Sequence, residues 1–133
     1  MVGTEGTGMR TEGSCLCGAV RFAVNQALPA PDACHCNQCR KFSGHYFTSS
    51  DVPKAALEVR GAENLRWYVT GKVRRGFCST CGSSLFWDPL ERDWIGVAMG
   101  AMDGATDTRT HIHVHVSSKG DYYDICDGLP QKQ

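Results

Sequence analysis

Apolar and polar residues alternate along many short stretches of the chain, which predicts a fold made mainly of β-strands. The alternation is clearest in "HIHVHV", residues 111–116, where three histidines alternate with three aliphatic residues. Alternate side chains of a strand point to opposite faces, so a two-residue period indicates a strand with one buried face. Further short β-like segments are expected around residues 20–24, 46–49, 57–60, 65–69 and 94–99, and in a strand that ends at Pro89.

Helical periodicity is weak by comparison. No stretch of about 11 or more residues repeats its apolar positions every 3.6 residues, and a short helix is expected only in "NQCRKFS", residues 37–43. Residues 27–33 contain two prolines and are predicted to form a loop. About seven to nine short strands without a tandem repeat indicate a mostly β fold of two sheets or a barrel.

Length and composition limit the organisation of the chain. A chain of 133 residues favours one domain, which we place at residues 13–133, after a polar, glycine-rich stretch at 1–12 that we expect to be a flexible tail. No apolar run is long enough to cross a membrane, and the N-terminus lacks the apolar core of a secretory signal, so we expect a cytoplasmic protein without a membrane partner. Lys and Arg (14) balance Asp and Glu (14), which argues against a nucleic-acid partner.

Eight cysteines are the most informative feature of the composition. In a reducing compartment, clustered cysteines are more typical of metal ligands or catalytic groups than of disulfides. Cysteines one residue apart, as in "CLC" and "CHC", also rarely meet disulfide geometry with each other. The spacing therefore favours metal binding over a disulfide framework.

Two of the cysteine pairs share one pattern. Cys15 and Cys17 occur in "CLCG", and Cys78 and Cys81 occur in "CSTCG", so a glycine follows each pair directly. A metal knuckle turns the backbone sharply after its second ligand, and glycine adopts the positive φ needed there at least cost. Four thiolates from two such knuckles predict a closed, tetrahedral, structural zinc site that joins the start of the domain to its middle.

The remaining cluster, Cys34, Cys36 and Cys39 in "CHCNQC", has three thiols on one short segment. Three protein ligands with an exchangeable fourth position are typical of a catalytic zinc. We therefore identify these three cysteines as candidate catalytic residues and as ligands of a second zinc. The fourth position could take water, a substrate or a distant side chain, and Cys126 and His45 are candidates for the last.

Several neighbouring residues allow alternative interpretations. "CNQC" could be a thiol redox motif, although the strand and long helix expected around such a motif are not evident. The histidines at 111, 113 and 115 could form the half-exposed face of a strand with its aliphatic residues in the core, or one of them could line the active site. His35, between two ligands, is expected to point away from the metal. Basic residues flank both cysteine regions and could meet substrate carboxylates: Arg40, Lys41, Lys72, Arg74 and Arg75.

Five segments in this order carry a resemblance to a known family: "GSCLCGAVRF", "CHCNQCRKFSG", "RRGFCSTCGSSLF", "HIHV" and "DGLPQ". From about Gly13 to Gln131, the chain resembles the glutathione-dependent formaldehyde-activating (GFA) enzymes. The resemblance implies a small β-tent-like fold with zinc-ribbon-like knuckles. It also implies two zinc ions, a structural one on Cys15, Cys17, Cys78 and Cys81 and a second one on Cys34, Cys36 and Cys39.

The same resemblance implies an activity, the joining of glutathione to formaldehyde to give S-hydroxymethylglutathione. The reverse reaction cleaves a carbon–sulfur bond, so the implied class is carbon–sulfur lyase. Zinc keeps a bound thiol largely as the nucleophilic thiolate, and it can polarise an aldehyde oxygen. The open second site could be partly empty in the isolated protein, because such a site can lose its metal or oxidise. A non-catalytic zinc module that binds a protein partner, and a thiol redox or metal-buffering protein, are the alternative functions.

Overall fold

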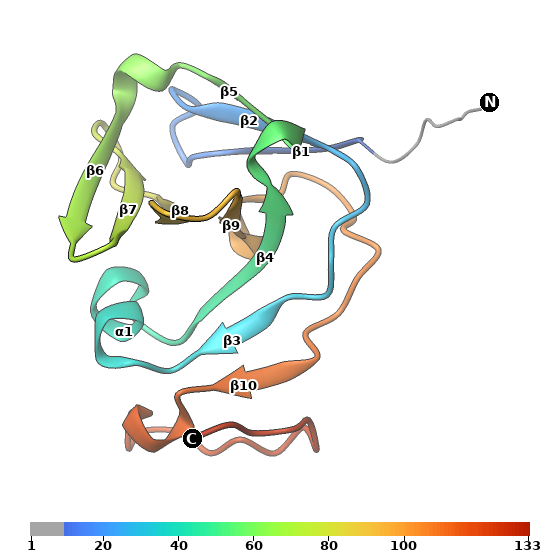
Figure 1. Ribbon diagram of the computed structural model, residues 1–133, viewed down its shortest axis with the longest axis vertical. Helices are drawn as coiled ribbons and strands as arrows, with labels where there is room; N and C mark the ends of the chain where they lie inside the picture. The colour runs from blue at the N-terminus through green and yellow to red at the C-terminus, as the bar shows by residue number, and fades with distance from the viewer. Residues whose placement is uncertain (1–9) are drawn as a thin grey trace.

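Ten strands form two sheets in the computed structural model, which describes residues 10–133 (Figure 1). The small sheet is antiparallel with the order β1-β2-β5, from β1 (Arg10–Ser14), β2 (Arg21–Asn25) and β5 (Leu57–Arg60). The large sheet has the order β10-β3-β4-β9-β8-β7-β6. The mostly β, two-sheet fold expected from the sequence is therefore confirmed.

The large sheet takes strands from the whole length of the chain. In chain order its strands are β3 (Asp32–Cys34), β4 (Phe47–Pro53), β6 (Leu65–Thr70), β7 (Val73–Cys78), β8 (Ser84–Pro89), β9 (Trp94–Ala98) and β10 (Ile112–Val114). Neighbouring strands are antiparallel except β10, which runs parallel to β3. The helix α1 (Asn37–Ser43) connects β3 to β4, and short 3-10 turns lie at η2 (Lys54–Ala56), η3 (Ala62–Asn64), η4 (Met99–Ala101) and η5 (Val116–Ser118).

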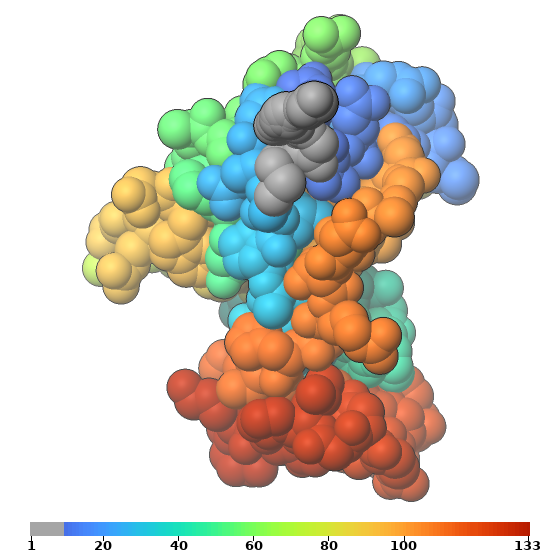
Figure 2. All heavy atoms as spheres, turned by 90° about the vertical axis from the view of Figure 1, so that its right-hand side faces the viewer, coloured from blue at the N-terminus to red at the C-terminus, as the bar shows by residue number. Residues whose placement is uncertain are grey.

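The connection between η4 and β10 crosses the outside of the molecule (orange in Figure 2). It leaves the small sheet where Met102 forms a bridge with Gly13. It reaches the large sheet where the His111 N–H donates to the Pro31 carbonyl (3.0 Å). This connection adds β10 as the last strand of the large sheet, next to the segment that carries the three-cysteine cluster.

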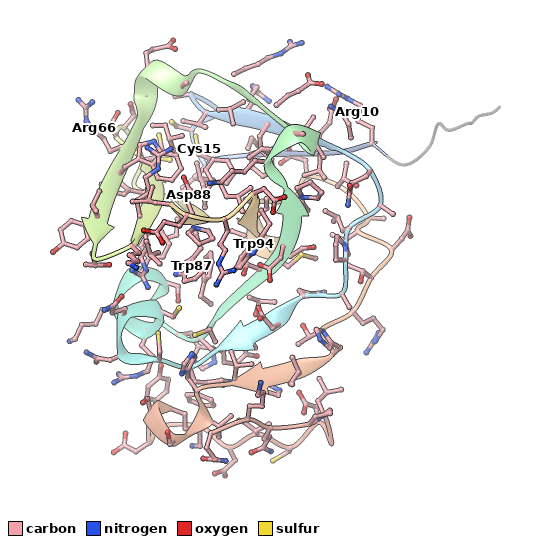
Figure 3. The ribbon with its side chains drawn as sticks, viewed as in Figure 1. Arg10, Cys15, Arg66, Trp87, Asp88 and Trp94 are labelled. Atoms are coloured by element: carbon pink, nitrogen blue, oxygen red, sulfur yellow. The ribbon has the colours of Figure 1, made fainter. Side chains whose placement is uncertain are left out.

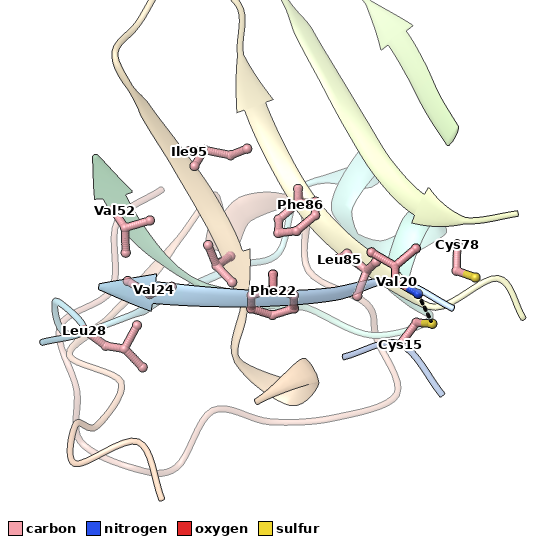
Figure 4. Close-up of a cluster of buried hydrophobic side chains, with 11 residues drawn as sticks. Cys15, Val20, Phe22, Val24, Leu28, Val52, Cys78, Leu85, Phe86 and Ile95 are labelled. Carbon is pink, nitrogen blue, oxygen red and sulfur yellow. Dashed lines mark hydrogen bonds between the residues drawn. The ribbon is translucent and has the colours of Figure 1, made fainter. Parts of the chain in front are cut away.

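The main apolar core joins the two sheets (Figure 4). The Phe22 ring from the small sheet meets the Phe86 ring from the large sheet edge-on, with centroids 5.3 Å apart. The buried members of this core are Cys15, Val20, Phe22, Val24, Leu28, Val52, Cys78, Leu85, Phe86, Ile95 and Val97. Two of the predicted metal ligands, Cys15 and Cys78, therefore lie within the main core rather than on a surface loop.

Several sequence-based expectations agree with the structure. The helix at residues 37–43 and the strand at 57–60 have the predicted bounds, and β2, β6, β8 and β9 lie within a residue or two of the segments expected for them. Each of these segments has clear periodicity, or is bounded by glycine, proline or cysteine turns.

Other expectations were wrong. The tail predicted at residues 1–12 extends too far, because Arg10, Thr11 and Glu12 belong to β1 and pair with β2; residues 1–9 lie outside the described part of the chain. The loop predicted at 27–33 runs into β3, which is too short to show a period. The strand expected over 111–116 shortens to β10, because His115 adopts a left-handed conformation (φ 55°).

Candidate metal centres and the adjoining cavity

The four-cysteine cluster brings together the two predicted knuckles. The sulfurs of Cys15, Cys17, Cys78 and Cys81 lie within 4.8 Å of one another. The first pair follows β1, and the second begins at the last residue of β7. The structure thus assembles one group from residues about 60 positions apart, as expected from the sequence.

A backbone turn that ends at a glycine shapes each knuckle. The Gly18 N–H donates to the Cys15 carbonyl (3.2 Å), and the Gly82 N–H donates to the Cys78 carbonyl (2.8 Å). Both glycines have positive φ, 81° and 79°, which is the conformation that the sequence predicted there. Backbone N–H groups point at the sulfurs, and Val20 donates to Cys15 Sγ (3.3 Å; Figure 4). Such donors stabilise negative charge on a thiolate.

The spacing of the sulfurs fits one metal ion. Thiolates around a tetrahedral zinc, each about 2.3 Å from the metal, are about 3.8 Å from one another. The Sγ of Cys17 lies 3.7 Å from that of Cys15 and 3.8 Å from that of Cys78. The donor set and its geometry therefore suit a closed four-thiolate site.

The three-cysteine cluster is built around the start of α1. Cys34 ends β3, Cys36 is the N-cap of α1, and Cys39 lies in its first turn; their sulfurs are within 4.8 Å of one another. The N-cap is unusual because its acceptor is a sulfur, which receives the Cys39 N–H at 3.3 Å. Cys39 is buried against Phe47 and Ala98, so a small second core holds this cluster in place.

The three thiols also influence one another's protonation. A hydrogen bond from the Cys39 thiol lowers the pKa of Cys34, and this effect outweighs burial, which acts in the opposite direction. The same interaction raises the pKa of Cys39, and burial raises it further. The cluster therefore favours a thiolate on Cys34, the form in which cysteine binds metal or attacks an electrophile.

Neither candidate for a fourth protein ligand lies in the cluster. Within residues 10–133, no other Cys, His, Asp or Glu adds a donor atom to the group of three. His45 Nδ1 is instead hydrogen-bonded to the Tyr122 hydroxyl (3.2 Å), and Cys126 is exposed elsewhere. The three sulfurs are therefore left with room for an additional ligand.

That additional ligand has a cavity to occupy. A cavity of about 180 Å³ adjoins the cluster and is enclosed mainly by the large sheet. Its lining comprises Asp32, Cys34, Cys36, Cys39, Phe47, Ser49, Asp51, Arg75, Trp87, Trp94, Val114 and His115. Trp87 and Trp94 stack with centroids 5.7 Å apart and form an apolar wall (labelled in Figure 3). One histidine, His115, lines this cavity, in agreement with one of the two interpretations of the histidine-rich strand.

A second histidine of that strand has a role that the sequence did not reveal. His113 is buried, whereas its aliphatic neighbours in β10 are only partly buried. The interpretation that places the aliphatic residues of this strand in the core is therefore wrong at this position, although His111 and His115 are exposed as it expected. Its Nδ1 pairs with His35 Nε2 (2.8 Å) and its Nε2 with the Asp127 carboxylate (2.8 Å), while His35 Nδ1 meets the Tyr123 hydroxyl. The pattern of alternation could not have shown this network, because its outer members lie in the irregular C-terminal segment.

One assignment of protons satisfies this network completely. Burial and the nearby His113 lower the pKa of His35 to about 4, so its ring is neutral at pH 7. Tyr123 then donates to His35, His35 donates to His113, and His113 donates to Asp127. His35 thus points away from the three sulfurs, as predicted, and its bonds fix the backbone between Cys34 and Cys36.

Comparisons with known proteins give a consistent result. The family model described as "Glutathione-dependent formaldehyde-activating enzyme" matches residues 10–118. A protein of Halomonas elongata, provisionally named a glutathione-dependent formaldehyde-activating enzyme, is 34% identical over 128 residues, which cover 88% of this chain and 82% of the relative. A crystal structure of a Rhodobacter sphaeroides protein, 28% identical, superposes with a TM-score of 0.60 over 74% of this chain and 98% of that chain. Among the helices of residues 10–133, none has the length and apolar character needed to span a membrane.

Proposed function

This chain belongs to the glutathione-dependent formaldehyde-activating enzyme family, and from this we propose that it is a zinc-dependent enzyme that joins glutathione to formaldehyde at Cys34, Cys36 and Cys39. The observation that supports this proposal most directly is a three-thiol cluster that opens on a cavity and has no fourth protein ligand among the described residues. Open sites of this kind are typical of catalytic zinc.

We assign the two cysteine clusters different roles. The closed cluster of Cys15, Cys17, Cys78 and Cys81 would hold a structural zinc, because two of its members are part of the main core. The open cluster would hold the catalytic zinc, which when bound keeps a substrate thiol as thiolate and so supplies the nucleophile.

The surrounding residues would prepare the reaction in two ways. The three cysteines would fix the place of the reacting sulfur, and β3 and α1 hold the cysteines. Phe47, Trp87 and Trp94 give the cavity an apolar wall, which would reduce the water around the reacting groups and strengthen electrostatic interactions there. The substrate thiolate attacks the carbonyl carbon and forms the C–S bond; the C=O π electrons move to oxygen, which takes up a proton to give the S-hydroxymethyl product. The reverse sequence is the carbon–sulfur lyase reaction.

A reducing, cytoplasmic environment would suit this chemistry. All eight cysteines are free in the structure, and both clusters need reduced thiols to bind metal. The alternative of a non-catalytic zinc module requires only the closed cluster and leaves the open cluster and its cavity without a purpose.

The test combines metal content with exchange kinetics. We expect two zinc ions per chain under reducing conditions in the wild type and one in Cys36→Ser. Formation of S-hydroxymethylglutathione is followed by exchange NMR, which separates the catalysed rate from the spontaneous one. Wild type should accelerate the exchange and Cys36→Ser should not, while the control Cys126→Ser, at an exposed cysteine outside both clusters, should behave as wild type. Equal exchange rates in wild type and Cys36→Ser would refute the proposed function.

A further inference from the structure

Arg75 is a buried cation with no acidic partner. Its side chain in β7 is 6% exposed, Nη1 donates to Thr70 Oγ1 (3.0 Å), and Nε makes no hydrogen bond. Among the ion pairs of residues 10–133, none involves Arg75. A guanidinium removed from water and left without an anion is costly, so its retention indicates a group that completes it.

The preceding residue shows what an internally satisfied arginine looks like in the same strand. Arg74 Nε lies 2.7 Å from an Asp88 carboxylate oxygen, and its guanidinium stacks over the Trp67 ring at 3.8 Å. The other oxygen of Asp88 pairs with Lys54 at 2.8 Å. The fold therefore provides a carboxylate for Arg74, whereas the described residues provide none for Arg75.

Arg75 also stands between two hollows. One is the cavity at the three cysteines, and the other is a groove of about 450 Å³ between α1 and the β6–β7 hairpin, which we call the outer groove. The lining of the outer groove comprises Asn37, Gln38, Lys41, Phe42, Tyr68, Thr70, Arg75 and Phe77. It contains two cations, Arg75 and Lys41, and no acidic residue, so it favours an anionic ligand.

The cavity and the outer groove differ in volume and in charged lining residues, so they suit different parts of a substrate. A cavity of about 180 Å³ is smaller than the range of about 300–1,000 Å³ typical of sites for whole small molecules, so it can take the reacting end of a peptide thiol but not the rest. The cavity also contains two carboxyl groups, Asp32 and Asp51, which disfavour a further anion there. The anionic part of such a substrate is better placed in the outer groove, with Arg75 at the boundary.

We propose that the outer groove binds a carboxylate of the thiol substrate, held by Arg75 and assisted by Lys41, while the thiol enters the cavity of the three cysteines. This inference rests on the proposed function and adds a residue that selects carboxylate-bearing thiols. A guanidinium matches a carboxylate with two parallel hydrogen bonds, which a lysine cannot reproduce. Lys41, exposed on α1, adds a weaker and more screened attraction.

The test measures binding without the reaction. S-methylglutathione keeps both carboxylates and has no free thiol to react with formaldehyde; its dimethyl ester lacks both negative charges. By titration calorimetry with the full chain, we expect Arg75→Gln to weaken the binding of S-methylglutathione about ten- to a hundredfold, the effect of losing hydrogen bonds between charged groups. The affinity for the dimethyl ester should change less than about twofold. Lys41→Gln should weaken the binding of S-methylglutathione about two- to fivefold. The matched control is Arg66→Gln, which removes an exposed arginine on β6 outside the outer groove (labelled in Figure 3) and should change neither affinity.

Several results would overturn the inference. If Arg75→Gln weakens the binding of S-methylglutathione and of its dimethyl ester equally, Arg75 has only a structural role. If the wild type does not bind S-methylglutathione, the outer groove is not a binding site. If Arg75→Gln does not fold, Arg75→Lys should still weaken the acid selectively, and a loss shared with the ester would count against the site. If Arg75→Gln slows formaldehyde addition to 2-mercaptoethanol as much as addition to glutathione, Arg75 acts on the reacting oxygen instead. Because binding is measured separately, an inactive protein that still shows selective, Arg75-dependent binding would refute the proposed function and retain the outer groove.

Discussion

Replacing one cysteine in each cluster should separate a structural metal from a catalytic one. Cys81→Ser removes a ligand from the closed cluster, whereas Cys36→Ser removes one from the open cluster. Both side chains are only partly buried, so neither substitution empties a large volume of the core. The two variants therefore differ mainly in which metal site they disable.

The expected magnitudes follow from the two environments. Structural zinc contributes about 10–16 kcal/mol of apparent binding free energy in small domains, so losing about a third of that would cost about 4 kcal/mol. For a chain of 133 residues the entropy of unfolding is about 0.28 kcal/mol/K, and Cys81→Ser should lower Tm by about 14 °C. At Cys36 the serine hydroxyl can still cap α1 and accept the Cys39 N–H, so the melting temperature should fall by about 4 °C or less.

Calorimetric melts in reducing buffer, paired with elemental analysis of zinc, provide the measurement. Cys126→Ser serves as the control, because it makes the same chemical change at an exposed cysteine outside both clusters. Each cluster variant should retain one zinc ion. Equal losses of Tm in Cys81→Ser and Cys36→Ser would refute the division into structural and catalytic sites.

Three further predictions concern stability. Gly61→Ala should lower the free energy of unfolding by more than about 2 kcal/mol, because a Cβ would lie 1.9 Å from the Ala19 carbonyl oxygen. Gly71→Ala, also at positive φ but with open space around it, should lower it by about 1 kcal/mol. Urea unfolding curves compare the two variants. The two cations paired with Asp88 lower its pKa despite burial, so wild-type stability should be full at neutral pH and fall as the pH drops below about 4, a fall that Asp88→Asn should reduce in acid titrations. His113→Ala should lower the free energy of unfolding by about 1–3 kcal/mol, because it leaves the buried His35 ring without an acceptor, and elemental analysis should show fewer than two zinc ions per chain. An unchanged melting temperature would contradict the network.

Local patterns in the sequence predicted the parts of the molecule that depend on local physics. The repeated cysteine–glycine turns predicted both knuckles, because a positive φ after the second cysteine is a property of the turn itself. The short helix expected at residues 37–43 is also present, with the expected bounds. Which cysteines share a group was also predictable, since the spacings allowed few combinations.

Features that depend on pairing between distant segments were not predictable. β3 is only three residues long and is held between β4 and β10, so its own sequence has no signal. His113 is buried because acceptors and donors from residues 35 and 127 satisfy both of its nitrogens, which no local pattern shows. The contrast between Arg74 and Arg75 likewise arises from the placement of Asp88. In the sequence the two arginines are equivalent neighbours.

The hydrogen-bond network of His35, His113, Tyr123 and Asp127 bears on how much of the polypeptide is needed to hold the three cysteines in place. The family model stops at residue 118, yet Tyr123 and Asp127, the two outer members of that network, lie beyond it. A chain shortened at the family boundary would keep all seven clustered cysteines and still leave two buried imidazoles with unmatched nitrogens directly behind Cys34 and Cys36. The last fifteen residues are thus part of the frame of the three-cysteine cluster, and we expect a chain that differs there to hold Cys34 and Cys36 less firmly in place, even where every cysteine is the same.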